Sequence, residues 1–260
     1  MLLTLDVGNS ETTLGLFDGD TLRDHWRIIT ETPRTSDELG VLLRGLVAGA
    51  DVPLARVRGV AIASVVRGMA THLVTACERW LPAERIEVFD ATSPLPITLD
   101  VDEPLTVGAD RIINTLVASR RYERDCVVVD LGTATTFDCI TREGVFLGGV
   151  IAAGVRTSAE TLFRRTSRLP ATELVPPTHV IGRRTEDCIR TGVMFGNAEL
   201  IDGLVRRILA EWPRTERPMV IATGGLAELF APICTTFDEV DPFLTLHGLA
   251  MAFELVGAGS

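Results

Sequence analysis

One pattern occurs twice in this chain: an apolar run, an Asp-x-Gly turn and a second apolar run. The first copy reads Asp6-Val7-Gly8-Asn9-Ser10-Glu11-Thr12, and the second reads Asp130-Leu131-Gly132-Thr133-Ala134-Thr135-Thr136. When the copies are overlaid with an offset of 124 residues, the Asp, the Gly and the last Thr coincide. A single copy would indicate an ordinary strand-end turn. Two copies in the same strand–turn–strand context indicate a duplicated fold.

Strand and helix signals follow the first copy of the turn. The apolar run 2–7, the run 12–17 and the segment 21–29 predict three antiparallel strands, with Asp18-Gly19-Asp20 as the turn before the third. Leucines at helical spacing after Ser36 predict a helix. The remaining elements expected in this half are a strand at 57–64 and helices at 69–80 and 110–122.

The same order begins again after residue 125. The expected strands are 126–131, 136–141, 145–151 and 220–223, and the expected helices are 158–166, 185–212 and 226–230. We therefore predict an α/β protein of two similar halves, residues 1–120 and 121–260. No Gly/Ser-rich linker marks the boundary, so the halves are expected to pack closely.

Composition limits the partners of the chain. Of its 260 residues, 46% are hydrophobic and 23% are charged, which is typical of a globular protein. The net charge of −10 opposes non-specific binding to nucleic acid or to an anionic membrane. The N-terminal segment has no cationic leader, and no apolar run approaches the roughly 20 residues of a membrane span. Five scattered cysteines without a CxxC pair indicate reduced thiols, so a cytoplasmic location is expected.

The two Asp-x-Gly turns are candidate phosphate sites. Backbone N–H groups and hydroxyls at such a turn form a concavity that can bind phosphate oxygens. Asp6 and Asp130 at the strand ends could hold a hard cation such as Mg²⁺, directly or through water. The alternative is a pair of ordinary hairpins whose threonines face solvent.

Three further features could take part in chemistry. In Gly108-Ala109-Asp110-Arg111, the carboxylate of Asp110 could accept a hydroxyl proton and Arg111 could bind a carboxylate or phosphate; the alternative is a helix cap with a surface ion pair. Ala222-Thr223-Gly224-Gly225 could let a ligand lie against the main chain, although a lone Gly-Gly turn is weak evidence. Thr185 follows Gly182-Arg183-Arg184, and N-capping is its default role.

These features, in this order, resemble type III pantothenate kinase, a bacterial family of the actin-like superfamily of acetate kinases, sugar kinases and heat-shock ATPases. The similarity extends over nearly the whole chain. Additional matching stretches are His25-Trp26-Arg27-Ile28, Thr35-Ser36-Asp37-Glu38, Val107, Gly148-Gly149-Val150-Ile151, Leu169-Pro170 and Leu244-Thr245-Leu246-His247-Gly248-Leu249. The resemblance implies duplicated actin-like (ribonuclease H-like) domains, each a mixed five-stranded sheet flanked by helices.

The resemblance also implies an activity: ATP and pantothenate give ADP and 4′-phosphopantothenate, the first step of coenzyme A synthesis. Asp110 corresponds to the general base. The implied ATP contacts are Asp6, Val7, Gly8, Asn9, Ser10, Glu11, Thr12, Thr13, Thr133, Gly224 and Gly225. The implied pantothenate contacts are Val101, Gly108, Ala109, Asp110, Arg111 and Thr185, with Thr185 donated by the second subunit of a homodimer. Asp130 corresponds to the ligand of a monovalent cation, K⁺ or NH₄⁺, and Asp6 is the candidate Mg²⁺ ligand.

Several departures from the family pattern touch the substrate side. Arg67 stands where a proline is frequent, Ala153 stands where another proline is frequent, and Arg183-Arg184 replace Lys-Asn. The aromatic residue common before the Gly-Ala-Asp-Arg motif is missing from the stretch around Val101. Two alternatives therefore remain: a paralogous kinase for another small hydroxyl compound, and a non-catalytic regulatory protein on the same fold.

Overall fold

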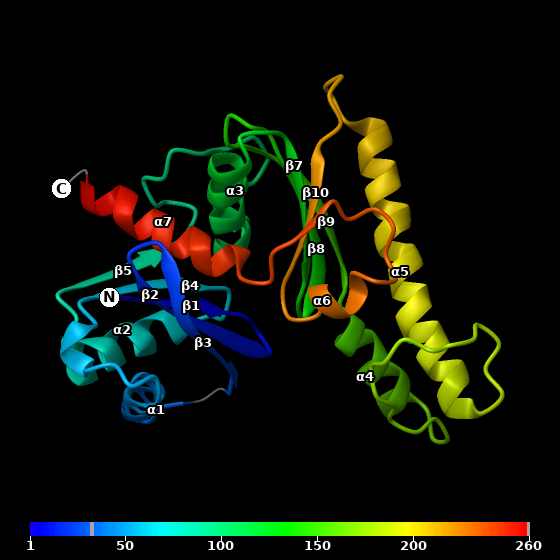
Figure 1. The fold of residues 1–260 in the computed structure, drawn as a ribbon, viewed down its shortest axis with the longest axis horizontal. Helices are drawn as coiled ribbons and strands as arrows, with labels where there is room; N and C mark the ends of the chain where they lie inside the picture. Colours follow the sequence, from blue (N-terminus) through cyan, green and yellow to red (C-terminus); the bar gives the residue numbers. More distant parts are fainter. Residues whose placement is uncertain (32–33, 259–260) are drawn as a thin grey trace. The chain divides into compact units, whose positions relative to one another are not determined.

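A computed structural model describes residues 1–31 and 34–258 of the chain, which fall into two compact units (Figure 1). The first unit contains Met1–Arg121 and Leu244–Ser260, and the second contains Tyr122–Phe243. This division differs from the expected halves 1–120 and 121–260 at the C-terminus. Helix α7 (Leu244–Ala258) packs on strands of the first unit, because its apolar side chains, such as Leu246 and Leu249, are buried there.

The first unit is built on a mixed sheet of five strands in the order β3-β2-β1-β4-β5. β1 pairs antiparallel with β2 and parallel with β4, β2 pairs antiparallel with β3, and β4 pairs parallel with β5. The strands are β1 (Leu2–Val7), β2 (Glu11–Asp18), β3 (Thr21–Ile29), β4 (Gly59–Ser64) and β5 (Arg85–Phe89). The other elements of this part are α1 (Ser36–Gly49), η1 (Leu54–Arg56), α2 (Met69–Trp80), β6 (Thr98–Leu99), η2 (Pro104–Thr106) and α3 (Ala109–Tyr122).

The second unit repeats this sheet. The five strands that belong to this unit run β9-β8-β7-β10-β11 within a six-stranded sheet, with the same sequence of antiparallel and parallel pairings. The strands are β7 (Cys126–Leu131), β8 (Ala134–Ile140), β9 (Val145–Ala153), β10 (Met219–Thr223) and β11 (Glu239–Val240). The helices are α4 (Val155–Arg165), α5 (Thr185–Glu211) and α6 (Ala227–Phe230). The duplication of a mixed five-stranded sheet flanked by helices is therefore confirmed.

The registers correct the overlay of the two turns. Val7 pairs with Thr12 across the first hairpin, and Leu131 pairs with Thr135 across the second. The first turn is therefore one residue longer than the second. The residue equivalent to Thr12 is Thr135, not Thr136 as the constant offset predicted.

Alternation along β1 and β7 decides where the two aspartates point. Leu5 and Val7 belong to the hydrophobic cluster that β1 shares with α1 and α2. Val129 and Leu131 belong to the corresponding cluster with α4 and α5. Because successive side chains of a strand point to opposite faces, Asp6 and Asp130 lie on the face opposite these clusters in their own units. The same strand pattern therefore orients both carboxylates in the same way relative to their sheets.

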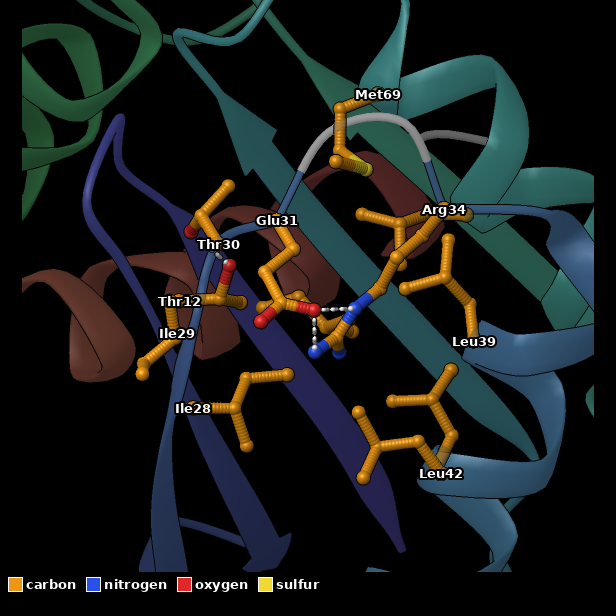
Figure 2. Close-up of a pocket in the computed structure, with 12 residues that line it drawn as sticks. Thr12, Ile28, Ile29, Thr30, Glu31, Arg34, Leu39, Leu42 and Met69 are labelled. Carbon is orange, nitrogen blue, oxygen red and sulfur yellow. Dashed lines mark hydrogen bonds and ion pairs between the residues drawn. The ribbon is translucent and has the colours of Figure 1, made fainter.

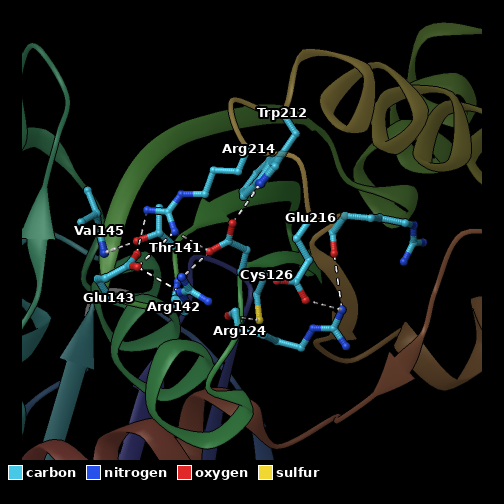
Figure 3. Close-up of polar contacts among 11 residues, drawn as sticks. Arg124, Cys126, Thr141, Arg142, Glu143, Val145, Trp212, Arg214 and Glu216 are labelled. Atoms are coloured by element: carbon cyan, nitrogen blue, oxygen red, sulfur yellow. Dashed lines mark hydrogen bonds and ion pairs between the residues drawn. The ribbon is translucent and has the colours of Figure 1, made fainter.

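A polar cluster holds the other end of β7, remote from Asp130 along the strand (Figure 3). Asp125 is buried and accepts hydrogen bonds from Trp212 Nε1 (3.1 Å) and from the Arg142 backbone N–H (2.9 Å). Arg214 donates to Asp125 and makes a two-pronged ion pair with Glu143. The Arg214 hydrogen bond, followed by bonds from Thr141 and Arg142, holds the pKa of the exposed Glu143 carboxyl below its usual range. We interpret this cluster as structural support for the turn that joins β8 to β9.

Within residues 1–31 and 34–258, no helix combines the length and apolarity that a bilayer span requires.

Candidate active site

The first Asp-x-Gly turn is a tight loop between β1 and β2. The Gly8 N–H donates to the Glu11 carbonyl at 3.0 Å, which leaves Asn9 and Ser10 exposed at the tip. Thr12 is only 5% exposed, and its hydroxyl is 2.8 Å from that of Thr30. The alternative of a plain hairpin with solvent-facing threonines is therefore wrong for Thr12.

The second turn is shorter and closes in the same manner. The Gly132 N–H donates to the Ala134 carbonyl at 3.1 Å, and the half-buried Thr133 forms the tip. Thr135, the equivalent of Thr12, is 1% exposed. Both turns thus present a short run of backbone at the tip, anchored by a buried threonine.

Gly224 lies directly against the Asp130 carboxylate. Thr223 pairs with Asp130 across β10 and β7, and the chain then turns at Gly224, whose φ of +87° favours glycine. A Cβ atom at Gly224 would overlap Asp130 Oδ1 and would come within 2.8 Å of the Leu131 nitrogen. Packing against Asp130 therefore requires glycine at position 224, whereas Gly225 is exposed.

Asp110 lies in the first turn of α3, as expected from the sequence. Its Oδ1 accepts a hydrogen bond from the Arg111 backbone N–H at 2.8 Å. Burial raises the pKa of the Asp110 carboxyl, and the Arg111 N–H and guanidinium oppose this rise without cancelling it. A carboxylate whose pKa is raised is a stronger base than an ordinary surface aspartate, which suits general-base catalysis.

Val65 connects the first turn with the start of α3. Its backbone N–H donates to the Val7 carbonyl at 3.1 Å. A Cβ atom added to Gly108 would lie 3.3 Å from Val65 Cγ1 and 2.5 Å from Asp110 Oδ1. The first unit therefore brings the end of β1 and the Gly108–Asp110 segment to the same neighbour.

Helix α3 is fixed in turn by α7. Thr245 donates its hydroxyl proton to Asn114 Oδ1 at 2.9 Å, and both side chains are buried. Gly248 packs so closely on α3 that a Cβ atom there would be 2.5 Å from Ile113 Cγ2. These contacts explain why the C-terminal stretch around His247 belongs to the first unit, and they give α3 a rigid support.

The sequence-derived site residues fall into two local groups and two separate positions. Asp6–Thr13 and Gly108–Arg111 lie in the first unit, with Val65 beside both; Ala109 is buried at the start of α3. Asp130, Thr133, Gly224 and Gly225 lie in the second unit, around the second turn. Val101 is half-buried between β6 and η2. Thr185 is the exposed first residue of α5, and the N-cap is Arg184, so the expected N-capping role of Thr185 is wrong.

Sequence reasoning missed the residues that support the turns. Val65 lies in the stretch Ser64-Val65-Val66-Arg67, which the sequence analysis noted only for its departure from the family pattern at Arg67. Gly154 donates its backbone N–H to the carbonyl of Thr133 at 3.2 Å. These roles depend on backbone contacts between distant segments, for which no residue-type pattern exists.

The donor chemistry of the site fits hard cations. Asp6 and Asp130 supply carboxylate oxygens, the ligands that Mg²⁺ and other hard cations prefer. In the part of the chain that the structure describes, no three His, Cys, Asp or Glu side chains gather into a metal-binding group. Mg²⁺ that bridges phosphates commonly takes only one or two protein carboxylates, so a single aspartate in either unit suits this chemistry.

A separate small pocket opens in the first unit (Figure 2). Its empty volume, including the open mouth, is about 340 Å³. Leu5, Leu39 and Met69 line it, and all three belong to the cluster formed with α1 and α2. The ion pair between Glu31 and Arg34, 2.8 Å long, crosses it. Thr12 and Thr30 also line this pocket, whereas Asp6 points to the opposite face of the sheet.

Comparisons with solved structures support the fold. A protein from Campylobacter jejuni, described as a conserved putative Baf family transcriptional activator, aligns with a TM-score of 0.60 at 18% identity, covering 98% of this chain and 99% of that one. A putative N-acetylglucosamine kinase from Porphyromonas gingivalis aligns with a TM-score of 0.53 at 13% identity, covering 98% and 99%. At such identities these likenesses concern the fold alone, which is the actin-like fold expected from the sequence.

Comparisons of sequence are more specific. The profile described as "Type III pantothenate kinase" matches residues 2–207. Proteins named type III pantothenate kinase are 42% identical in Acidothermus cellulolyticus (98% of each chain) and 43% identical in Desulfatibacillum aliphaticivorans (98% of this chain, 99% of the relative). One from Anaeromyxobacter sp. strain K is 44% identical, covering 98% of this chain and 99% of the relative. With this similarity over nearly its full length, the chain belongs to the type III pantothenate kinase family.

Proposed function

We propose that this chain transfers the γ-phosphoryl group of ATP to pantothenate, with Asp110 as the general base. The observation that carries the proposal is the position of Asp110 in the first unit. A partly buried carboxylate of raised pKa begins α3, next to Val65, which is hydrogen-bonded to the end of the first phosphate turn. An acid–base group and a candidate polyphosphate site therefore share one neighbourhood, as a kinase requires.

The nucleotide contacts follow from the two turns. Asp6–Thr13 would bind phosphate oxygens in the first unit, and Thr133, Gly224 and Gly225 would be the ATP contacts in the second. Backbone N–H groups and hydroxyls can bind charge that spreads over the phosphoryl oxygens in the transition state. The tips are short and backed by buried threonines, so these donors are held in place before the ligand arrives.

The acceptor is activated by proton removal. The pantothenate hydroxyl donates its proton to Asp110 Oδ, its oxygen attacks the γ-phosphorus in line, and ADP leaves with the electron pair of the broken P–O bond. Gly108 and Ala109 let the substrate approach the main chain, and Arg111 would pair with the pantothenate carboxylate. Val101 would line the apolar side of the acceptor, in the place where relatives commonly carry an aromatic residue.

Two cations complete the proposal. Asp130 would hold K⁺ or NH₄⁺, and Asp6 would hold Mg²⁺, directly or through water. Such cations would supply positive charge against the negative charge that develops on the phosphoryl oxygens. Asp130 supports this role because its carboxylate lies against the turn at Gly224, at the edge of the second phosphate site.

We further propose a cytoplasmic homodimer in which Thr185 reaches the acceptor site of the other subunit. Thr185 is exposed at the start of α5, and two strongly exposed apolar residues precede it: Val180 at 68% and Ile181 at 85%. An interface there would remove this apolar surface from water. Mixing Asp110→Asn and Thr185→Ala subunits tests the arrangement, because a shared site would regain activity in the mixed dimer. A site contained in one subunit would regain none.

The activity itself is tested by coupled ADP release in the presence of Mg²⁺ and K⁺. Pantothenate should stimulate release far above the rate without an acceptor. Faster release with another hydroxyl compound would favour a paralogous kinase, and no release with any member of a panel would favour a regulatory protein. Growth rescue of a cell that lacks pantothenate kinase would then establish the reaction in vivo.

A further inference from the structure

The tips of the two phosphate turns are held from behind by equivalent backbone bonds. In the first unit, the Thr30 N–H, directly after β3, donates to the Ser10 carbonyl at 2.9 Å. In the second unit, the Gly154 N–H, directly after β9, donates to the Thr133 carbonyl at 3.2 Å. Each tip peptide is thus oriented by the residue that follows the third strand of its sheet.

A helix side chain also holds the second tip. The hydroxyl of Thr157, in the first turn of α4, donates to the same Thr133 carbonyl at 2.7 Å. In the first unit, the hydroxyls of Thr12 and Thr30 bond to each other at 2.8 Å. The second tip therefore depends in part on a side chain of α4.

The bond to the carbonyl determines where the next N–H points. A trans peptide is planar, with its C=O and N–H groups directed to opposite sides. Because Gly154 and Thr157 both hold the Thr133 carbonyl toward α4, the N–H of Ala134 is directed away from α4. That N–H is a donor of the turn that the proposed function assigns to phosphate.

We propose that Thr157 is a positioning residue for ATP: its hydroxyl fixes the Thr133–Ala134 peptide so that the turn presents its donors to the phosphates. This inference rests on the proposed function, since it assumes that the second turn binds ATP. Thr157 touches the turn and not the ligand, so it acts through Thr133. Its effect should appear in nucleotide binding and not in pantothenate binding.

Gly154 shows how little space the contact allows. A Cβ atom there would overlap the Thr133 carbonyl oxygen and would be 2.5 Å from the Gly132 oxygen. Its φ of −65° is accessible to any residue, so the constraint is the approach of the turn and not backbone strain. The start of α4 and the second turn therefore pack as one piece, and substitution at Gly154 must displace the tip.

The test compares Thr157→Val with Thr157→Ser and with Thr161→Val. Thr161 is a matched control, because it lies one turn further along α4 and its hydroxyl bonds only within the helix, to the Thr157 carbonyl at 2.8 Å. We expect Thr157→Val to raise the KM for MgATP about three- to tenfold, the scale of one lost hydrogen bond. The KM for pantothenate should stay within about twofold, and Thr157→Ser should restore the KM for MgATP. Gly154→Ala should raise it further.

The possible outcomes separate this inference from the proposed function. An unchanged KM for MgATP in Thr157→Val, or an equal rise in Thr161→Val, would overturn the positioning role while leaving the kinase assignment intact. A parallel rise in both KM values would also overturn it, because general loosening of the fold would explain that result. Wild-type protein that neither binds MgATP in calorimetry nor releases ADP would overturn the proposed function itself.

Discussion

The two Asp-x-Gly turns share one backbone architecture and differ in the residues that surround them. Each connects the first two strands of a sheet with the same strand order, and each follows an aspartate that points away from the helical cluster of its unit. In its own unit, the first turn lies near Asp110, through Val65, and the second turn has Gly224 against its aspartate. Under the proposed function, this comparison implies a division of labour: the first unit would activate the acceptor, and the second would hold the monovalent cation.

The largest effect should come from removing the base. Asp110→Asn keeps the size of the side chain and the acceptor for the Arg111 N–H, but it cannot take a proton. We expect kcat to fall by about 100- to 10,000-fold, the usual cost of losing a general base. ADP release under saturating substrates measures this. A variant with wild-type kcat would break the assignment of acceptor chemistry to the first unit.

The same variant should not be less stable than the wild type. Because burial raises the pKa of Asp110 in the folded protein, the folded state retains a proton that the unfolded chain has already lost. The stability contributed by this group therefore decreases as pH rises from about 3.9 through the raised pKa, and ionised Asp110 is unfavourable above it. Asn removes this cost, so the denaturant midpoint at pH 8 should be equal or higher. A large decrease would show that Asp110 supports the fold.

The pH profile of turnover provides a second test of Asp110. Since only the ionised form accepts a proton, kcat should fall with decreasing pH, and the fall should centre above the ordinary aspartate value of about 3.9. The residual kcat of Asp110→Asn should not show this fall at low pH. The same fall in the variant would mean that another group titrates.

The two aspartates of the turns should differ in their cation dependence. Asp130→Asn should raise the K⁺ concentration for half-maximal activity about 10- to 100-fold, because an interaction with a charged group is worth about 1.5–3 kcal/mol. Asp6→Asn should change the Mg²⁺ requirement and leave the K⁺ response nearly unchanged. Titration of each salt at fixed ATP measures both, and matching responses in the two variants would contradict the division of labour.

The turn glycines should respond differently to a methyl group. A Cβ atom on Gly8 would lie 2.9 Å from the Glu11 carbonyl oxygen, whereas one on Gly132 would lie 3.6 Å from the Ala134 oxygen. We expect Gly8→Ala to destabilise the protein by about 1–3 kcal/mol and to raise the KM for MgATP. Gly132→Ala should be neutral or slightly stabilising, because alanine restricts the unfolded chain. Chemical denaturation of both variants measures their stabilities. Equal losses of stability would refute the difference in turn geometry.

The smallest effect is expected at Thr30. Thr30→Val removes the hydroxyl contact with Thr12 but keeps the backbone N–H that holds the Ser10 carbonyl. Stability should fall by about 1 kcal/mol, while the KM for MgATP should stay within about twofold. A clear rise in this KM would show that the first tip, like the second, depends on a side chain.

The fold was largely predictable where the pattern was periodic. Leu2–Val7, Thr21–Ile29, Met69–Trp80 and Cys126–Leu131 begin and end where the sequence predicted. β5 was missed, because Arg85 and Glu87 interrupt its apolar pattern, and β11 has only two residues. Both are defined by pairing with a neighbouring parallel strand, which is a tertiary property that local propensity does not encode.

The candidate site was predictable in its residue types but not in its supports. Asp110 at a helix start and Gly224 at a turn were expected because carboxylates and glycines leave recognisable signals. The one-residue difference between the turns was not, since identical threonines at 12 and 136 favoured the wrong register. Val65 and Thr157 act through contacts with distant backbone, so their roles emerge only in three dimensions.

The most direct test of the account is a crystal structure with a non-hydrolysable ATP analogue and pantothenate. Our account predicts that the phosphates of the nucleotide contact the Gly8–Ser10 tip. It also predicts that the pantothenate hydroxyl lies within about 2.6–3.2 Å of an Asp110 carboxylate oxygen. Phosphates bound away from this tip, or an acceptor hydroxyl far from Asp110, would contradict it.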